Sequence, residues 1–209
     1  TIVYRALEYL VWNPPDWIVY PGGALGNTSS CGKALMELYN LGWIKKIPRL
    51  LVVNSEGANT FYELTNGLFG SKKLTWNDGR PDMSLIREYY IEKDKNGIRP
   101  HTKATAIQIG KPANLIKALR SIAFTNGIVA QVSDKEMSDG MALVGLNGFD
   151  CEMASGAVPA GIRKLRQEEM IKKDDIVVGI LTGKQKDPQV SINYHLDQSN
   201  TFSKPPVAK

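Results

Sequence analysis

Residues 16–28 read DWIVYPGGALGNT, and this stretch decides the fold class. Its first part, 16–20, is rich in β-forming residues and ends at a Pro-Gly-Gly breaker. A helical pattern then runs over residues 28–42, with one apolar face formed by Ala34, Leu35 and Leu38. Residues 50–53 (LLVV) form a continuous apolar run, which is typical of a strand buried on both faces. Strand, glycine-rich turn, helix and strand in this order predict a right-handed crossover in a parallel sheet.

The rest of the chain continues the alternation of helices and strands. Apolar residues recur at helical spacing in four more segments: 2–11, 115–122, 137–144 and 152–165. Ser133 and Glu136 fit a capping box in front of the third of these helices. Strands are predicted at 128–132 and at 175–181, the second of them as the last buried strand. We therefore expect an α/β fold, an open and mostly parallel sheet with helices on both faces, formed by residues 1–202.

Two stretches depart from this pattern. Residues 64–102 contain many glycines, prolines and charges with little periodicity. We expect an irregular surface excursion there, with one short helix at 82–90. Residues 203–209, which include two adjacent prolines, are expected to form a disordered tail. In an open α/β sheet ligands bind where the strands end, so the loops that follow the strands are the places to look for a site.

Composition disfavours several classes of protein. The chain has 209 residues, 43% of them hydrophobic and 22% charged, as in an ordinary globular domain. The net charge of +5 is spread along the chain, without the basic stripe that a nucleic-acid-binding protein shows. No apolar run approaches the ~20 residues of a membrane span. Cys31 and Cys151 have no CxxC or Cys/His neighbourhood, so we expect no metal site and two free thiols, which favours the cytoplasm.

The loop of residues 22–27 gives the sharpest chemical signal. Glycines between a strand and a helix let backbone N–H groups converge, and the positive end of the following helix attracts anions. Such a loop binds phosphate without lysine or arginine. The same residues also fit a strand-helix turn that uses glycine only for its geometry. The loop is not a Walker loop, because no Gly-Lys-Ser/Thr follows, and it lacks the GxGxxG spacing of a dinucleotide site.

Three other segments give weaker signals. Thr182 follows the strand at 175–181 and would point into the same crevice as the loop, although a threonine there more often caps its own turn. The small residues at 151–157 (CEMASGA) would let a helix start close to a bulky group, or pack tightly on another helix. The polar residues at 54–59 (NSEGAN) follow another strand, and a plain turn explains them about as well.

Six segments in fixed order are more specific than these motifs taken singly. They are PDWIVYPGGALGNTSSCGKALMELYNLGWI (15–44), LLVVNSEGAN (50–59), ATAIQIG (104–110), ALRSIAFTNGIVAQVSDKEM (118–137), CEMASGAVPAGIRKL (151–165) and VVGILTGKQKDP (177–188). In this order the chain resembles threonine synthase over nearly its whole length. That family uses pyridoxal phosphate and has the tryptophan-synthase-β fold type. The resemblance implies the large domain of a fold-type-II enzyme, here incomplete.

The resemblance also implies roles for individual residues. One loop would cradle the cofactor phosphate through its main-chain N–H groups: Gly22, Gly23, Ala24, Leu25, Gly26 and Asn27. The family often has Asn where Ala24 stands, so the cradle here rests on the backbone. Thr182 would hydrogen-bond the pyridine nitrogen and, as a neutral hydroxyl, leave that nitrogen largely unprotonated. Glu152, Ala154 and Ser155 would lie along the cofactor wall.

Three parts of the family pattern are absent from these residues. They are the Schiff-base lysine in a segment like SFKDRG, an SGN-type loop that grips the cofactor ring, and a stretch that binds the substrate phosphate. We therefore expect no catalytic residue in this chain, a truncated or processed start at Thr1, and the lysine upstream of it. The intact protein is expected to be a homodimer that converts O-phosphohomoserine and water to threonine and phosphate, with the chain alone inactive.

Three other interpretations remain open. The first is a serine/threonine dehydratase-like enzyme of the same fold type, which shares the glycine-rich phosphate loop. The second is a non-catalytic protein that binds a phosphate-bearing ligand with this loop and lacks the lysine. A nucleotide-binding domain is the weakest of the three, because the acidic residue and the fingerprint spacing of such domains are missing.

Overall fold

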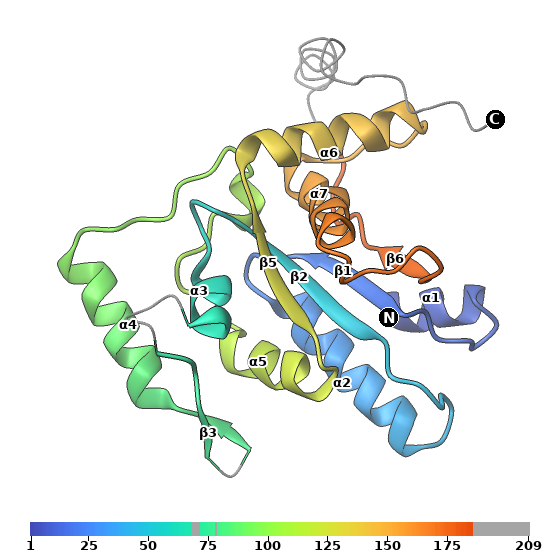
Figure 1. Cartoon of the computed structure of the whole chain (residues 1–209), viewed down its shortest axis with the longest axis horizontal. Helices are drawn as coiled ribbons and strands as arrows, with labels where there is room; N and C mark the ends of the chain where they lie inside the picture. Colours follow the sequence, from blue (N-terminus) through green and yellow to red (C-terminus); the bar gives the residue numbers. More distant parts are fainter. Residues whose placement is uncertain (68–71, 78, 186–209) are drawn as a thin grey trace.

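The computed structural model describes residues 1–67, 72–77 and 79–185. At its centre is a parallel four-stranded sheet in the order β5-β2-β1-β6 (Figure 1). The strands are β1 (Trp17–Pro21), β2 (Arg49–Ser55), β5 (Ile128–Val132) and β6 (Val177–Gly179). The predicted parallel arrangement is confirmed, and β5 has the bounds that the sequence predicted. The tail expected at 203–209 lies outside the described residues.

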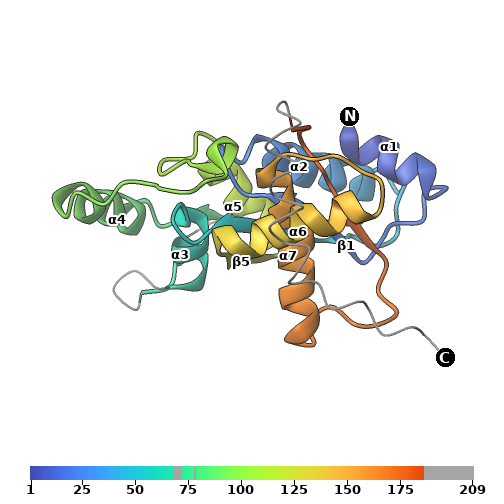
Figure 2. The ribbon, with the colours of Figure 1, turned by 90° about the horizontal axis from the view of Figure 1, so that it is seen from above.

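Helices cover both faces of the sheet, as predicted. α6 (Asp134–Leu146) and α7 (Met153–Gln167) pack on the face that carries Val19, Leu51 and Val53. α1 (Ile2–Tyr9), α2 (Gly26–Asn40) and α5 (Leu115–Phe124) pack on the face that carries Ile18, Leu50 and Val52. In Figure 2, α2 and α7 lie on opposite sides of the strands. Successive strand residues point to opposite faces, and with both faces covered the strand sequence is apolar throughout.

The start of α6 and the end of α1 can be compared with the positions that the sequence patterns predict. Ser133 caps α6 as predicted, since its Oγ accepts a hydrogen bond from the N–H of Glu136 (3.2 Å) and Glu136 Oε2 accepts one from the N–H of Ser133 (2.7 Å). α1 is shorter than predicted and ends at Tyr9. Val11 and Trp12 follow with φ of 52° and 57°, a left-handed conformation that cannot continue a helix.

The excursion at 64–102 is more regular than predicted. α3 (Thr60–Asn66) leads into it, and β3 (Trp76–Asn77) pairs with β4 (Arg80–Pro81). The short helix predicted at 82–90 is α4 (Met83–Lys95), which runs on past residue 90. Asp82 caps it, its Oδ1 accepting from the N–H of Ser84 at 2.9 Å. A connector of residues 96–114 then includes the short 3₁₀ helix η1 (Thr105–Ile107).

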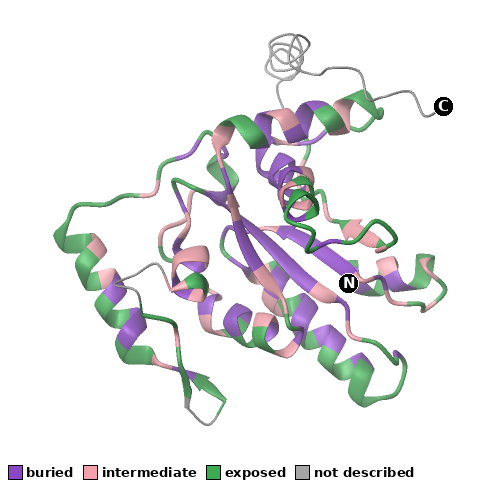
Figure 3. Cartoon of the chain, in the orientation of Figure 1, coloured by how far each residue is buried: buried purple, intermediate pink, exposed green. Residues whose placement is uncertain are grey.

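The last strand differs from its prediction. The segment 175–181 was expected to be a buried strand, whereas β6 has three residues and is only partly buried (Figure 3). Ile176 is 49% exposed and Leu181 39% exposed. The physical reason is position, because β6 stands at the edge of the described sheet and has β1 as its one neighbour. An apolar run alone does not tell a central strand from an edge strand.

The two edges of the sheet are not alike. On the outer side of β5, the side-chain amide of Asn66 donates to the carbonyl of Val129 (3.2 Å), and the ammonium of Lys164 donates to the carbonyl of Gln131 (2.9 Å). The outer carbonyls of β5 are thus occupied by side chains. No strand of the described residues pairs with the outer side of β6.

Candidate functional site

A cleft of about 270 Å³ opens at the carboxyl ends of β1 and β6. It brings together four segments that are distant in sequence, which are the loop after β1, η1, the start of α7 and the turn after β6. The lining residues are Pro21, Gly23, Ala24, Leu25, Gly26, Asn27, Thr28, Ala106, Ile107, Glu152, Ala154 and Thr182. Thr182 and the glycine loop therefore share one cleft, as expected for residues that follow neighbouring parallel strands.

Gly22 belongs to the sheet and not to the cleft. Its N–H donates to the carbonyl of Val53 (2.8 Å), and its own carbonyl accepts from the side-chain amide of Asn54 (2.7 Å). A Cβ at position 22 would lie 2.5 Å from that amide nitrogen, so only glycine fits. The strand register thus engages the N–H of Gly22, which is one of the donors expected in the phosphate cradle.

The peptide group between Ala24 and Leu25 is oriented by contacts with the start of α5. Asn114 donates its backbone N–H (3.2 Å) and its side-chain amide (3.3 Å) to the carbonyl of Ala24. Because a trans peptide points its C=O and N–H in opposite directions, the N–H of Leu25 is turned away from α5. Leu25 itself has φ 64° and ψ 16° and is buried, which anchors the turn from which α2 starts at Gly26. A left-handed leucine costs energy that neighbouring contacts must offset, a feature found at functional sites.

The N–H groups of residues 23–28 find no acceptor within the described part of the chain. The first bonded one is the N–H of Ser29, which donates to the carbonyl of Leu25 (3.0 Å). The hydroxyl of Thr28 is buried in the cleft wall and likewise has no partner among the described residues. Gly23 lets the loop pack directly on η1, since a Cβ there would lie 3.0 Å from the carbonyl oxygen of Ala106. Residues that line the cleft thus carry several donors without acceptors in the described part of the chain, at the positive end of a helix, an arrangement that suits an anion.

The opposite wall is held by Ser155. Its fully buried Oγ accepts the backbone N–H groups of Thr182 (2.9 Å) and Gly183 (3.3 Å). The N–H of Glu152 donates to the carbonyl of Gly183 (2.9 Å), and the hydroxyl of Thr182 donates to Glu152 Oε1 (3.4 Å). Ser155 was expected along the wall of the cleft. It lies behind the wall instead, because the turn after β6 needs an acceptor for two N–H groups.

Residues 1–183 match a family described as "Pyridoxal-phosphate dependent enzyme". The chain belongs to this family. It is 33% identical to the threonine synthase of Methanosarcina acetivorans and 32% identical to that of Methanocaldococcus jannaschii, in each case over 92% of its length. It is 29% identical over 93% of its length to "Threonine synthase 2, chloroplastic" of Arabidopsis thaliana. The chain spans 43%, 42% and 34% of these three relatives, respectively.

Two solved structures share the fold. A fungal L-serine ammonia-lyase from Rhizomucor miehei matches with a TM-score of 0.63 at 18% identity, over 94% of this chain and 54% of that one. The processed form of threonine deaminase isoform 2 from Solanum lycopersicum matches with a TM-score of 0.65 at 12% identity, over 97% of this chain and 46% of that one. The fold expectation, an open parallel sheet of a fold-type-II enzyme, is confirmed.

The cleft fits the phosphate group of pyridoxal phosphate. A bound phosphate would satisfy the buried hydroxyl of Thr28, which is left without a partner in the described residues. It would also accept from backbone N–H groups of the loop, which have no acceptor among the described residues. No lysine of the described residues lines this cleft. Two lysines, Lys103 and Lys184, line an adjoining pocket of about 290 Å³.

Sequence reasoning missed two parts of the cleft. Ala106 and Ile107 lie against Gly23, yet the segment ATAIQIG was recognised only as part of the family pattern and had no role. Thr28 was noted as the start of a helix, whereas it is the third residue of α2 and contributes a buried hydroxyl. A hydroxyl residue within the first turn of a helix that follows a glycine-rich loop is the signal that could have indicated it.

The two thiols take no part in this chemistry. Both are free and buried, Cys31 in α2 and Cys151 just before α7. Burial raises the pKa of each to about 11, so both remain protonated at neutral pH. The described residues hold no group of three or more His, Cys, Asp or Glu that could bind a metal ion. Within the same residues no helix is long and apolar enough to cross a membrane.

Proposed function

We propose that the protein to which this chain belongs is a threonine synthase, which converts O-phosphohomoserine and water to threonine and phosphate. One observation carries the proposal. A loop whose N–H groups have no acceptor among the described residues lines one cleft together with Thr182, which carries a neutral hydroxyl. The three curated relatives described above are all threonine synthases and match more than nine-tenths of the chain, which favours this reaction over others of the family.

The chain would hold the cofactor by its phosphate group and by its ring nitrogen. The backbone N–H groups of residues 23–28 and the hydroxyl of Thr28 would bind its phosphate, and Thr182 would face its ring nitrogen. When bound, pyridoxal phosphate withdraws electrons from the amino acid attached to it. The hydroxyl of Thr182 donates to Glu152 here, and it would turn to donate to the ring nitrogen instead. A hydroxyl cannot supply the negative charge that keeps such a nitrogen protonated, so the nitrogen would stay largely neutral.

Ser155 would act as a positioning residue. By accepting from the N–H groups of Thr182 and Gly183, it fixes the turn that presents the threonine hydroxyl to the cleft. Ala154 leaves room beside it, and Glu152 provides a carboxylate at the mouth. We further propose that the intact protein is a homodimer and acts in the cytoplasm, in keeping with two free thiols.

The test is an assay of the full-length gene product. O-phosphohomoserine should yield threonine and phosphate, and L-serine and L-threonine should yield little keto acid and ammonia. Thr182→Ala should lower turnover at least about tenfold with folding intact, because it removes a hydrogen bond to the ring. The fold likeness to an ammonia-lyase and a deaminase supports one alternative, a dehydratase. Keto acid as the main product, with no threonine formed, would establish that alternative.

The chain alone is proposed to bind the cofactor without reacting. Since no lysine of the described residues lines the cleft, nothing there holds an amine next to the cofactor. After incubation with pyridoxal phosphate, borohydride reduction and peptide mapping should find scattered, substoichiometric labelling of surface lysines and no threonine from O-phosphohomoserine. One lysine labelled stoichiometrically, together with turnover, would show that these 209 residues hold a complete active site.

A further inference from the structure

A second pocket lies apart from the cofactor cleft. It is formed by α4, the start of α3 and residues 98–111 of the connector, and it shares no lining residue with the cleft. Its volume of about 370 Å³ suits a small molecule. Six of its side chains carry the argument: Tyr89, Tyr90, Lys93, Asp94, Arg99 and Lys111. Nothing in the proposed reaction uses any of them.

Charges of both signs meet at the pocket mouth. Asp94 forms ion pairs with Lys111 (2.6 Å) and Arg99 (3.1 Å). The hydrogen bond from Lys111 lowers the pKa of Asp94, with a smaller effect of Arg99, so this carboxylate stays ionised. Two cations thus share one carboxylate, and one positive charge is left without a partner among the described residues. The ammonium of Lys93 is matched separately by Glu63 (2.8 Å).

The wall beside these charges is aromatic and apolar. Tyr89 and Tyr90 contact each other edge to face, with ring centroids 5.4 Å apart. Lys111 lies over the ring of Tyr90, with its ammonium 5.4 Å from the ring centroid, so the cation and the apolar surface are adjacent. Ile98, which is 49% exposed, adds an aliphatic side chain to the same pocket. The hydroxyl of Tyr89 donates to Glu63, which holds this ring in place.

We propose that this pocket binds a free α-amino acid with an apolar side chain. Its carboxylate would be held by Lys111 and Arg99, its ammonium by Asp94, and its side chain by the Tyr90 ring and Ile98. A zwitterion suits the site because both signs of charge are offered side by side, whereas a simple anion would be repelled by Asp94 and a simple cation by Lys111 and Arg99. A nucleotide or another polyanion fits poorly, since a single positive charge is unmatched and Asp94 faces the ligand.

Equilibrium dialysis of the cofactor-free chain with radiolabelled L-leucine tests the proposal. Two analogues of nearly the same shape measure what each charged group of leucine contributes to binding. One is 4-methylpentanoate, which lacks the ammonium, and the other is 3-methylbutylamine, which lacks the carboxylate. L-leucine should bind at concentrations below about 10 mM, and each analogue at least about tenfold more weakly, because each loses one charge-assisted hydrogen bond. The measurement needs neither cofactor nor turnover, so its result is independent of the proposed reaction.

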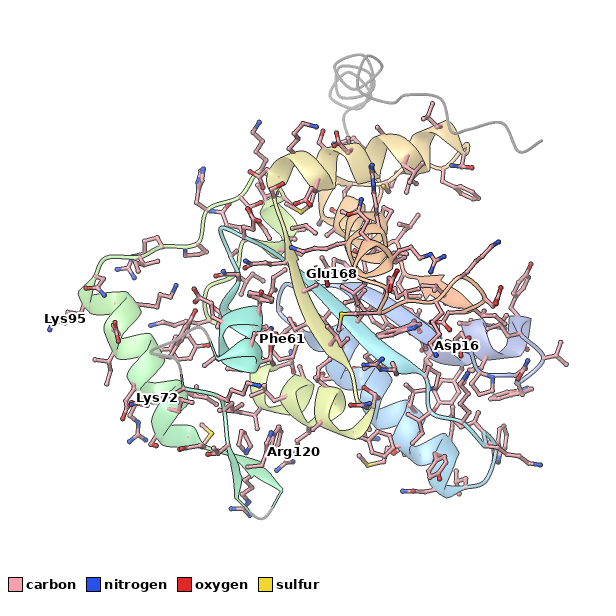
Figure 4. All side chains as sticks on the ribbon, viewed as in Figure 1. Asp16, Phe61, Lys72, Lys95, Arg120 and Glu168 are labelled. Atoms are coloured by element: carbon pink, nitrogen blue, oxygen red, sulfur yellow. The ribbon has the colours of Figure 1, made fainter. Side chains whose placement is uncertain are left out.

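Three variants locate the binding. Asp94→Asn and Lys111→Gln should each weaken leucine binding at least about tenfold. Lys95→Gln is the matched control, because Lys95 ends the same helix, does not line the pocket and points away from the sheet (Figure 4). It should bind leucine as the unchanged chain does. Circular dichroism establishes that each variant is folded, since all three side chains are exposed.

Several outcomes overturn the proposal. No retention of leucine at about 10 mM would exclude a site of useful affinity. Equal binding of leucine and 4-methylpentanoate, or displacement of leucine by inorganic phosphate, would make the pocket a simple anion site. Unchanged binding in both Asp94→Asn and Lys111→Gln would place leucine elsewhere on the chain.

Discussion

At the scale of single residues, Thr28 has opposite effects on folding and on binding. Its hydroxyl is buried in the first turn of α2 without a hydrogen-bond partner among the described residues. A buried hydroxyl that has lost water and gained no partner destabilises the folded state. The same unpaired hydroxyl is available to an anion that enters the cleft. A cost in stability of the free chain is thus recovered when a ligand binds.

Thr28→Val should therefore separate stability from affinity. The free energy of unfolding in urea should stay the same or rise by about 1 kcal/mol, because valine has nearly the same shape without the unpaired group. Affinity for pyridoxal phosphate, measured by equilibrium dialysis, should fall about tenfold with the loss of one bond to a charged oxygen. Thr28→Ser is the control, since it keeps the hydroxyl and loses a methyl group, so it should retain affinity. A valine variant that binds as well as threonine would remove Thr28 from the site.

At the scale of elements, the loop after β1 is positioned by its neighbours as much as by its own sequence. Gly23 lies against the backbone of η1, and Ala24 is held by the start of α5. The two glycines at positions 23 and 26 look alike in the sequence. They differ in surroundings, since a Cβ at Gly26 would meet its nearest neighbour, the side-chain amide of Asn114, at an ordinary 3.6 Å.

The pair Gly23→Ala and Gly26→Ala tests this difference. Gly23→Ala pushes η1 away and should lower the free energy of unfolding by about 1–3 kcal/mol, as overpacking does. Gly26→Ala should be neutral or stabilising by up to about 1 kcal/mol, because alanine is the better residue in a helix. Urea denaturation compares the two. Equal losses would show that the loop is not fitted against η1 as described.

Patterns within a segment were enough to predict several elements. The period of the apolar residues placed β5 and α5, and the pair Ser133 and Glu136 marked the start of α6. The convergence of Thr182 with the glycine loop followed from parallel strands alone, because their carboxyl ends share one edge of the sheet.

Features that depend on neighbours were not predictable. The N–H of Gly22 is occupied because Pro21 pairs with Val53, and no local motif reveals that register. The burial of Ser155 depends on a turn 27 residues further along the chain. The exposure of β6 depends on which strands lie beside it. In each case the deciding contact comes from a part of the chain outside the local segment.

At the scale of the whole molecule, Asp16 ties three strands together at their starting ends. Asp16 lies next to the starts of β1 and β6 (Figure 4). Its carboxylate accepts from the N–H of Ile176 (2.8 Å) and forms an ion pair with Lys46. Its carbonyl accepts from the N–H of Arg49 (2.9 Å), where β2 begins. The hydrogen bond from Lys46, and after it the one from Ile176, hold the pKa of Asp16 below its ordinary value of 3.8.

A lowered pKa makes the stability from Asp16 dependent on pH. The contribution is fully present above the unfolded-state value of 3.8 and is lost as the pH falls through the lower value of the folded state. Asp16→Asn should therefore reduce the free energy of unfolding at neutral pH, and the difference from the unchanged chain should shrink at about pH 2.5. Urea titrations at both pH values measure it. Glu37→Gln, which breaks the exposed pair with Lys33, should have a small effect, and a loss at Asp16 that does not vary with pH would contradict the assignment.

The unequal edges of the sheet set a limit on how copies of the chain can join by strand pairing. Asn66 and Lys164 already occupy outer carbonyls of β5, so an incoming strand cannot continue the ladder there. Beside β6 the described sheet ends without such a cover. If two copies paired edge to edge through β6, both remaining edges would be β5. Growth by strand addition would then stop at two, whereas a sheet with two free edges has no such limit.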